Sequence, residues 1–278
     1  MEITRQLLDQ TIEIAKQAGQ AILEVYKDET NFDTQVKADS SPVTKADLAA
    51  HAILEPALAA IDSTVPVLSE EGTIPDYEIR STWDKYWIID PLDGTTNYLH
   101  GIPHFAISIA AIDKPLAKGG KLIAGGVFDP MRNEFFFAEP GKGAFLNDRR
   151  IRVSGRRNMV DCLFATGIPF KGRGDNSDHA TFRAELTEVM AETSGVRRLG
   201  SAALDLAWVA AGRYDGFWER GLSIWDIAAG VLILREAGGF VSDFASRDKA
   251  LASGDVVAGN PQTHLGLLKM LKEGRNRG

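Results

Sequence analysis

An apolar run, Tyr86–Ile89, leads directly into the acidic segment Asp90–Asn97, whose sequence is Asp-Pro-Leu-Asp-Gly-Thr-Thr-Asn. The apolar run predicts a buried strand, which would deliver two carboxylates, three residues apart, into a tight turn. Gly94 lets the backbone approach a ligand closely. The residues after it are suited to opening a helix whose free N–H groups would face the same place. Carboxylates beside anion-binding amides indicate a divalent cation between the protein and a phosphate group.

A plain turn is the alternative explanation for this segment, because Asp-Gly is a common turn signal. Two other segments favour a cation site. The run Val65–Ser69 ends in Glu70 and Glu71, and a single acid, Asp226, interrupts the apolar run Ile224–Leu234. Burial of a lone carboxylate is costly, although an Asp also suits a helix N-cap and the two Glu residues suit a solvated loop. Taken together, acids at the ends of three apolar segments favour one shared cation site.

The candidate ligands in these segments are all oxygen atoms. A set of hard oxygen ligands selects Mg²⁺, Mn²⁺ or Ca²⁺ over Zn²⁺, and Mg²⁺ commonly completes its shell with water and substrate phosphate. Two such ions about 3.5–4 Å apart would clamp the attacking and leaving oxygens of an in-line displacement. The candidate ligands are Glu70, Asp90, Asp93, Asp226 and the carbonyl oxygen of Leu92.

The segments Asp90–Asn97 and Trp225–Gly230 resemble the two signature motifs of the inositol monophosphatase family, and Glu70–Glu71 resembles its third acidic element. The resemblance extends over about residues 38–243, and Gly200–Ala207 is similar to the bacterial branch. The Thr-Thr-Asn ending is closer to inositol monophosphatases than to nucleotide bisphosphatases or fructose-bisphosphatases. The resemblance implies an α/β fold, a layered α-β-α-β-α sandwich of the inositol monophosphatase and fructose-bisphosphatase type, and a Mg²⁺-dependent phosphatase activity.

The resemblance also implies catalytic roles for individual residues. The Thr95 hydroxyl would help to activate the attacking water, with Asp47 behind it, and Glu70 would orient water on a third, weakly held ion. Two main Mg²⁺ ions are implied, with Mn²⁺ as a substitute and Li⁺ as an inhibitor. The implied ligands are Glu70, Asp90 and the Leu92 carbonyl for the first ion, and Asp90, Asp93 and Asp226 for the second.

On the substrate side, the resemblance implies that Glu219, seven residues before Asp226, accepts hydrogen bonds from inositol hydroxyl groups. The amides of Gly94 and Thr95 would cradle the phosphate, and Lys37 would be a basic residue on a loop near the metals. The residues expected to contact substrate are Leu92, Asp93, Gly94, Thr95, Gly200, Ser201, Ala202, Glu219 and Asp226.

Several of these side chains have simpler structural explanations. Thr44–Asp47 predicts a helix capping box, with Asp where Glu or Gln is usual. On sequence alone we favour this capping role for Asp47, and the two roles are compatible if the helix end lies against the site. Ser201 suits the N-cap of a helix over 202–211, and Glu219 and Lys37 suit solvated charges.

Composition predicts a soluble enzyme. A chain of 278 residues can bury a substantial core, and we expect a single phosphatase domain, 1–278, made of two closely packed halves, roughly 1–150 and 151–278. The net charge of −7 argues against direct nucleic-acid binding, and no apolar run reaches membrane-spanning length. The N-terminal segment has the spacing of an amphipathic helix rather than a signal peptide. The lone Cys162 excludes an intrachain disulfide, and a cytoplasmic location follows as the expectation.

The order of helical and strand-like periods is compatible with the implied fold. Polar residues and glycine predict a flexible loop over 169–177. We expect helices over 3–28, 43–61, 178–191, 201–211, 226–237 and 261–273, and strands over 65–69, 86–90, 105–112, 121–128, 133–138, 161–166, 214–218 and 255–258.

Inositol monophosphate or a similar polyol phosphate is the expected substrate. Histidinol phosphate and fructose bisphosphate stay open, because ligands of the metals touch only the phosphate. Bacterial members of the resembled family known as extragenic suppressor proteins imply a different role, in which the chain binds protein partners in transcription and ribosomal RNA synthesis. The resemblance further implies a homodimer, for which the apolar residues Phe135–Phe137 offer surface, although these aromatics are equally suited to the core.

Overall fold

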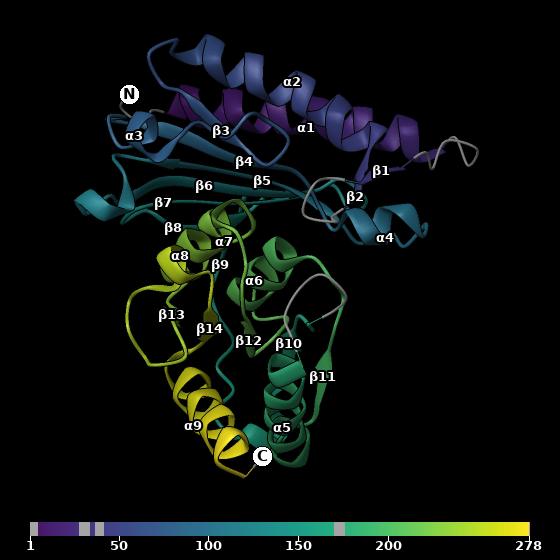
Figure 1. Cartoon of the computed structure of the whole chain (residues 1–278), viewed down its shortest axis with the longest axis vertical. Helices are drawn as coiled ribbons and strands as arrows, with labels where there is room; N and C mark the ends of the chain where they lie inside the picture. Colours follow the sequence, from purple (N-terminus) through teal and green to yellow (C-terminus); the bar gives the residue numbers. More distant parts are fainter. Residues whose placement is uncertain (1–4, 28–33, 37–41, 170–175, 278) are drawn as a thin grey trace.

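The structure is a computed structural model that describes residues 5–27, 34–36, 42–169 and 176–277. In this part of the chain, helices and sheets alternate in five layers, in the order α-β-α-β-α (Figure 1). The α/β fold class and the layered sandwich expected from the sequence are confirmed.

The first layer consists of α1 (Arg5–Lys27) and α2 (Lys45–Ile61), which pack against each other and cover one face of the larger sheet (Figure 1). Helix α2 begins at a capping box, as predicted. The N–H groups of Ala46 and Asp47 donate to the Thr44 hydroxyl over 3.1 and 3.3 Å, and the Thr44 N–H donates to the Asp47 carboxylate over 2.8 Å. This cap fixes the end of α2 that lies closest to the acidic segments.

The larger sheet has seven strands in the order β3-β4-β5-β6-β7-β8-β9, with β3 parallel to β4 and the other pairs antiparallel. The inner strand β5 is buried along its whole length because helices cover both faces of the sheet. The strands are β3 (Val67–Ser69), β4 (Tyr86–Asp93), β5 (Ala106–Ile112), β6 (Leu122–Asp129), β7 (Glu134–Glu139), β8 (Gly143–Leu146) and β9 (Arg149–Ile151).

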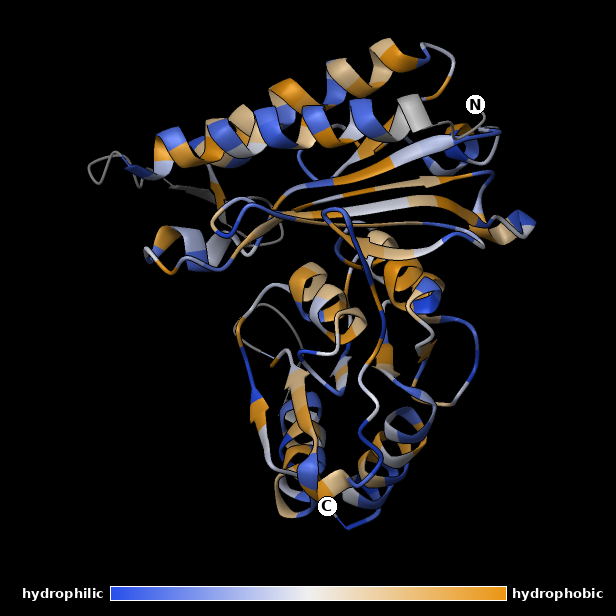
Figure 2. Ribbon diagram, turned by 180° about the vertical axis from the view of Figure 1, so that it is seen from behind, coloured by the Kyte–Doolittle hydropathy of each residue, from blue (hydrophilic) through white to orange (hydrophobic). Residues whose placement is uncertain are grey.

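The middle layer contains α6 (Ala202–Ala210), α7 (Ile224–Glu236) and the short α8 (Ala250–Ser253). Figure 2 shows α6 and α7 mainly in hydrophobic colours, whereas the outer helices alternate between hydrophilic and hydrophobic. A helix buried between two sheets must be apolar on nearly all sides, and nine consecutive residues of α7, 226–234, are buried. The acid Asp226 therefore begins a run of buried residues.

The smaller sheet has five strands in the order β11-β10-β12-β14-β13, in which β10 is parallel to β11 and to β12. Helices α5 (Asn176–Glu192) and α9 (Pro261–Arg277) pack together as the last layer. The strands are β10 (Leu163–Thr166), β11 (Gly195–Arg197), β12 (Gly216–Glu219), β13 (Phe240–Ser242) and β14 (Val256–Gly259).

All the predicted helices and strands are present, with shifts of a few residues at their ends. The helix predicted over 43–61 begins at Lys45 because residues 42–44 form a short strand. Of the predicted loop 169–177, residues 170–175 lie outside the described residues, as does Lys37, and α5 already begins at residue 176. The sequence did not predict β8, β9, β11 or β13, nor the short elements α8, β1 (Thr34–Val36), β2 (Pro42–Thr44), α3 (Tyr77–Arg80), η1 (Leu116–Lys118) and η2 (Met159–Asp161).

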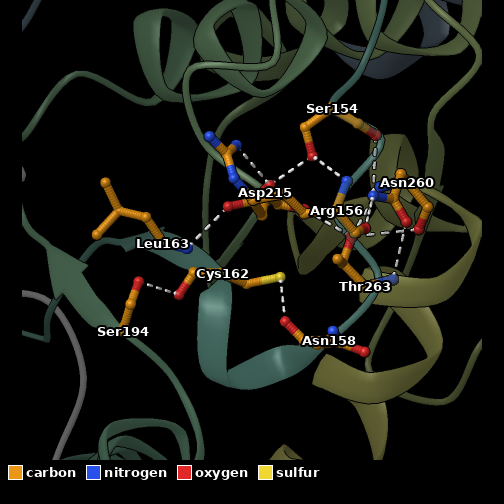
Figure 3. A network of polar contacts seen from close by, with 9 residues as sticks. All are labelled: Ser154, Arg156, Asn158, Cys162, Leu163, Ser194, Asp215, Asn260 and Thr263. Atoms are coloured by element: carbon orange, nitrogen blue, oxygen red, sulfur yellow. Dashed lines mark hydrogen bonds and ion pairs between the residues drawn. The ribbon is translucent and has the colours of Figure 1, made fainter.

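The chain crosses from the larger to the smaller sheet after β9, and a polar network fixes this crossing (Figure 3). The buried carboxylate of Asp215 accepts hydrogen bonds from the Ser154 hydroxyl, from the Arg156 guanidinium over 3.2 Å and from the Leu163 N–H over 2.8 Å. The Asn260 amide donates to the carbonyl oxygens of Ser154 and Arg156 over 3.0 and 2.8 Å. These contacts hold the crossing segment against β10 and α9.

One hydrophobic cluster includes side chains from both sheets and from the helices between them. The assignment of a single domain made of two closely packed halves stays a prediction. Phe135 and Phe136 are buried within the chain, so neither is available to a partner subunit. Among the described residues, no helix combines the length and apolar character needed to span a bilayer.

Candidate active site

The first acids of the site meet because β3 and β4 are parallel. Ser69 pairs with Ile89, so that Glu70 and Asp90 follow side by side at the carboxyl ends of the two strands. The Glu70 N–H donates to the carbonyl of Ile89 over 3.2 Å, which extends the strand pairing by one step. The strand ends suggested by the apolar runs therefore lie together, as the shared cation site requires.

Strand β4 bulges between its two acids. Asp90 pairs with Ser108 on β5, whereas Asp93 pairs with Ala106, so the register shifts between them. The Leu92 N–H turns back to donate to the Asp90 carboxylate over 3.0 Å. Gly94 follows with a φ of 101°, and a Cβ there would lie 3.1 Å from a backbone oxygen of the facing loop. Helix α4 (Thr95–Leu99) then begins, as the turn chemistry predicted.

Thr95 connects this turn to the capped end of α2. Its hydroxyl oxygen lies 3.1 Å from the carboxylate of Asp47 and 3.1 Å from the carbonyl oxygen of Leu92. Asp47 thus caps α2 and also contacts the Thr95 hydroxyl, while its part in activating water stays a prediction.

Asp93 points toward the N-terminus of α6. One of its carboxylate oxygens accepts a hydrogen bond from the Ser201 hydroxyl over 2.6 Å and another from the Ala203 N–H over 2.7 Å. The favourable end of the helix dipole also lies near this carboxylate. Ser201 is the N-cap residue of α6, as predicted, and it is fully buried. Its expected contact with substrate, like that of Gly200 and Ala202, stays a prediction.

Asp226 reaches the site from the first turn of α7. The helix begins at Ile224, two residues earlier than predicted, and its N-cap is Ser223, whose N–H donates to the Asp226 carboxylate over 2.8 Å. The alternative assignment of Asp226 as the N-cap is therefore wrong. Oxygen atoms of Glu70, Asp90 and Asp226 all lie within 4.8 Å of one another, close enough to share a metal ion.

The electrostatics of this cluster favour a cation. Burial raises the pKa of Asp90 well above its ordinary value, and the nearby charges of Glu70, Asp93 and Asp226 raise it further. Burial likewise raises the pKa of Asp93 to about 7, against the lowering effect of its hydrogen bonds. Crowded oxygen ligands whose charges oppose one another fit a hard divalent ion such as Mg²⁺, which would neutralise them.

Burial also raises the pKa of Asp47, to about 6, although the hydrogen bonds from Thr44 lower it. A carboxylate with a pKa near the working pH is suited to exchanging a proton. Because Asp47 contacts the Thr95 hydroxyl, the pair offers a route for a proton away from the site.

Glu219 ends β12, and a cavity of about 370 Å³ lies beside it. The charge of Glu219 contributes to the raised pKa of Asp93, which places the two acids in the same electrostatic environment. A larger cavity of about 580 Å³ lies between α1 and the β7–β8 edge and contains none of the predicted site residues. The smaller cavity includes Glu219 but none of the predicted metal ligands, and it is lined by Gly167, Ile168, Pro169, Asp178, Phe182, Trp218, Glu219, Arg220, Gly221 and Asp255.

Sequence reasoning missed some residues that hold the acids in place. The Asn97 amide donates to the carbonyl oxygens of His104 and Leu199 over 2.8 and 2.6 Å, tying the acidic turn to the loop before α6. His51 of α2 lies 2.9 Å from the hydroxyl of Ser69, next to Glu70. Asn97 belongs to the quoted motif, which was a usable signal, whereas nothing in the local sequence singled out His51.

Comparison with known proteins gives the same assignment throughout the chain. The family model described as "Inositol monophosphatase family" matches residues 4–275. An inositol-1-monophosphatase of Mesorhizobium japonicum is 47% identical over 268 residues, covering 96% of each chain. The Nus factor SuhB of Pseudomonas aeruginosa is 42% identical over 267 residues, again covering 96% of each chain.

Among solved structures, the extragenic suppressor protein SuhB of Bartonella henselae superposes with a TM-score of 0.88 at 43% identity. The match covers 97% of this chain and 99% of that chain. Similarity of this extent in both sequence and structure confirms the resemblance that the motifs suggested. The chain therefore belongs to the inositol monophosphatase family.

Proposed function

We propose that this protein is a Mg²⁺-dependent phosphatase that hydrolyses inositol monophosphate to inositol and phosphate. The observation that carries the proposal is the cluster of Glu70, Asp90 and Asp226, whose oxygens lie within 4.8 Å of one another. Membership of the inositol monophosphatase family supports the same reaction class. Cation-binding acids at this separation suit a phosphate ester, whose own negative charge would otherwise be repelled.

The ligands that we propose for Mg²⁺ follow from this cluster. Glu70, Asp90 and the Leu92 carbonyl would hold one ion, and Asp90, Asp93 and Asp226 a second, with a third ion more weakly bound near Glu70. A bound Mg²⁺ would supply charge for the phosphate oxygens and would lower the pKa of a water molecule. The hydrogen bonds from Ser201 and Ala203 support this set, since they orient the Asp93 carboxylate.

The proposed proton transfer uses Thr95 and Asp47. When the Thr95 hydroxyl donates to Asp47, its oxygen is free to accept a hydrogen bond from a water molecule beside the phosphate. A proton taken from that water would pass to Asp47, whose raised pKa of about 6 allows it to be held briefly near neutral pH. The N–H groups of Gly94 and Thr95, at the start of α4, would hold the phosphate.

A phosphate-release assay tests the proposal. Purified protein should release phosphate from inositol monophosphate with Mg²⁺, more slowly with Mn²⁺, and not after chelation with EDTA. Histidinol phosphate, fructose bisphosphate and adenosine bisphosphate complete the panel, because the metal ligands do not distinguish among them. A marked preference for one of these other esters would make that ester the substrate in place of inositol monophosphate. Activity undiminished by EDTA would overturn the metal-dependent mechanism.

We further predict inhibition by Li⁺. This ion is small and hard enough for an oxygen site built for Mg²⁺, but it carries half the charge that the phosphate needs. Li⁺ bound at the second site after turnover would trap phosphate, so inhibition should be uncompetitive with substrate. Inhibition should weaken in Asp226→Asn, insofar as activity remains. Turnover unaffected by LiCl, with KCl as the ionic-strength control, would reject this prediction and leave the phosphatase assignment standing.

A second candidate function, binding to protein partners in transcription complexes, is favoured by the relatives named Nus factor SuhB. Pull-downs from a bacterial extract with wild type and Asp93→Asn separate the two functions. A transcription protein that is captured equally by wild type and Asp93→Asn would support a role independent of catalysis. If neither captures a transcription protein, this second function is rejected. We also propose that the protein is cytoplasmic and forms a homodimer. Light scattering, which gives the mass in solution, tests the oligomeric state.

A further inference from the structure

The carboxyl ends of β10 and β12 lie side by side next to the cavity of about 370 Å³ that Gly167 and Glu219 line. The two strands are parallel, and Thr166 pairs with Trp218, so Gly167 and Glu219 occupy the next positions of the same register. The Thr166 hydroxyl lies 2.8 Å from the carbonyl oxygens of both Trp218 and Gly167, and it holds the two strand ends together. Gly167 is therefore the neighbour of Glu219 across the sheet, although 52 positions separate the paired residues Thr166 and Trp218 in sequence.

The Glu219 side chain uses the space that a side chain at Gly167 would fill. A Cβ on Gly167 would lie 1.9 Å from the carboxylate carbon of Glu219 and 2.1 Å from each of its oxygens. Such distances are far inside van der Waals contact, so the carboxylate and a methyl group cannot occupy these positions together. The positive-φ requirement that explains Gly94 does not apply at Gly167. Gly167 instead leaves the space that the Glu219 carboxylate occupies.

The backbone after Glu219 is held on its other side. The Arg220 guanidinium donates two hydrogen bonds to the buried carboxylate of Glu185, over 2.7 and 2.5 Å, and its carbon lies 3.5 Å from the ring centroid of Phe244. With the strand fixed by Thr166 before it and by Arg220 after it, the movable part is the Glu219 side chain. A methyl group at position 167 would therefore displace the carboxylate rather than the strand.

We propose that Gly167 is a positioning residue that sets where the Glu219 carboxylate lies and thereby selects phosphate esters with a polyhydroxylated leaving group. The proposal rests on the proposed function, in which Glu219 accepts hydrogen bonds from the hydroxyl groups of the substrate. An ester whose leaving group has no such hydroxyls gains nothing from this position. A side chain at residue 167 should consequently reduce selectivity for polyols while leaving the metal cluster intact.

The test compares Gly167→Ala with Gly155→Ala, in which an added Cβ meets nothing within 4 Å. On inositol monophosphate, kcat/KM of Gly167→Ala should fall by about tenfold, mainly through KM, as expected for loss of a charged hydrogen bond. On 4-nitrophenyl phosphate the fall should be much smaller. Gly155→Ala should match wild type on both substrates. Equal losses of Gly167→Ala on the two substrates would overturn the proposal.

A double-mutant cycle sharpens the test. Glu219→Gln should show the same selective loss, and Gly167→Ala combined with Glu219→Gln should lose no more than either change alone, because both act through one carboxylate. Additive losses in kcat/KM would mean that Gly167 acts on something other than Glu219.

A crystal structure of Gly167→Ala provides a readout that needs no substrate. The β10–β12 pairing should be kept and the Glu219 carboxylate should have moved away from residue 167. A carboxylate in its original place would overturn the proposal. Wild-type protein that is inactive on inositol monophosphate would instead remove the proposed function, and the position of Glu219 in this crystal structure would still decide the role of Gly167.

Discussion

Two groups of buried acids in this molecule have opposite electrostatic surroundings. Asp90 is buried among Glu70, Asp93 and Asp226, whose charges raise its pKa beyond the effect of burial. Glu185 is fully buried as well, but the guanidinium groups of Arg220 and Arg275 lie 2.5–2.7 Å from its oxygens. Arginine side chains of the chain itself therefore compensate the charge of Glu185, whereas the acids around Asp90 add negative charge.

This difference distinguishes acids that would bind a cation from acids that hold the fold together. A buried carboxylate with its own guanidinium partners has its charge offset within the fold, which is why Glu185 ties α5 to β12 and α9. Asp215 follows the same pattern with Ser154 and Arg156 (Figure 3). Asp90 lies instead among acids whose charges raise its pKa, and a ligand of opposite charge would stabilise such a crowd of carboxylates.

The largest expected effect is on catalysis, in Asp93→Asn. An Asn oxygen can still accept hydrogen bonds from Ser201 and Ala203, so the fold should be kept. The charge offered to a second cation is lost, and we expect the turnover of inositol monophosphate at saturating Mg²⁺ to fall by about a thousandfold. Asp148→Asn, at an exposed position, is the matched control and should keep wild-type turnover. Near-normal turnover in Asp93→Asn would mean that these acids are not a catalytic cation site.

The next effect is on stability, in Glu185→Gln. This change leaves two guanidinium groups facing a neutral side chain, and we expect unfolding to become easier by about 3 kcal/mol. The side chains of Arg220 and Arg275 are about 30% exposed, which limits the penalty to the lower end of the range for buried pairs. Urea unfolding by circular dichroism measures the change.

Asp90→Asn is the corresponding change in the other group, and its effect should have the opposite sign. In EDTA, removing one charge from the crowded acids should make the protein more stable than wild type, while the Leu92 N–H keeps an acceptor. If both substitutions destabilise the metal-free protein equally, the distinction between the two groups of acids fails.

Local pattern was enough to predict most of the secondary structure and the acids of the site. The helices and longer strands show a clear periodicity of apolar residues. Acids of the site follow apolar runs, and the parallel pairing of β3 and β4 brings the ends of two such runs together. Strands such as β9 and β13 have three residues each, too few for an alternation to be recognised. They form because a neighbouring strand supplies their hydrogen bonds.

The support of the site was harder to predict, because it depends on contacts between distant parts of the chain. Asn97 donates to Leu199, 102 positions away, and Ala203 donates to Asp93, 110 positions away. Residue type indicated that Ser201 caps a helix, but nothing in the sequence around it indicated that the same hydroxyl holds Asp93. Pattern identifies the acids, and the tertiary fold determines which groups orient them.

A further prediction compares two serines that each donate to a buried acid. Ser201→Ala removes the hydroxyl that orients Asp93, and we expect Mg²⁺ affinity to fall by about tenfold, as for other groups that orient metal ligands. Ser154→Ala removes the corresponding donor to Asp215 and should reduce stability while leaving Mg²⁺ affinity unchanged. Calorimetric titration of both variants with Mg²⁺ measures the difference. A similar fall in affinity in both variants would mean that Ser201 acts only through the fold.

The last prediction is a pH dependence of stability in the metal-free protein. The pKa of Asp93 is about 7 and that of Asp47 about 6 in the folded chain, both above the ordinary value for Asp. Between about pH 4 and pH 7 the folded state therefore binds more protons than the unfolded state, and its stability must fall as pH rises through this range. The fall should amount to several kcal/mol, because each unit of pKa shift is worth about 1.4 kcal/mol.

Mg²⁺ should oppose this trend, because the ion binds the ionised acids and competes with protons. Its stabilising effect should therefore grow between about pH 5 and about pH 8. Urea unfolding in EDTA and in Mg²⁺ across this range tests both statements. The Asp93→Asn variant, which lacks the group with the higher of these two pKa values, should show a shallower slope in EDTA. Stability that rises with pH in EDTA would show that the charges of the site are already compensated by the chain, as they are around Glu185, and the contrast between the two groups of acids would then be lost.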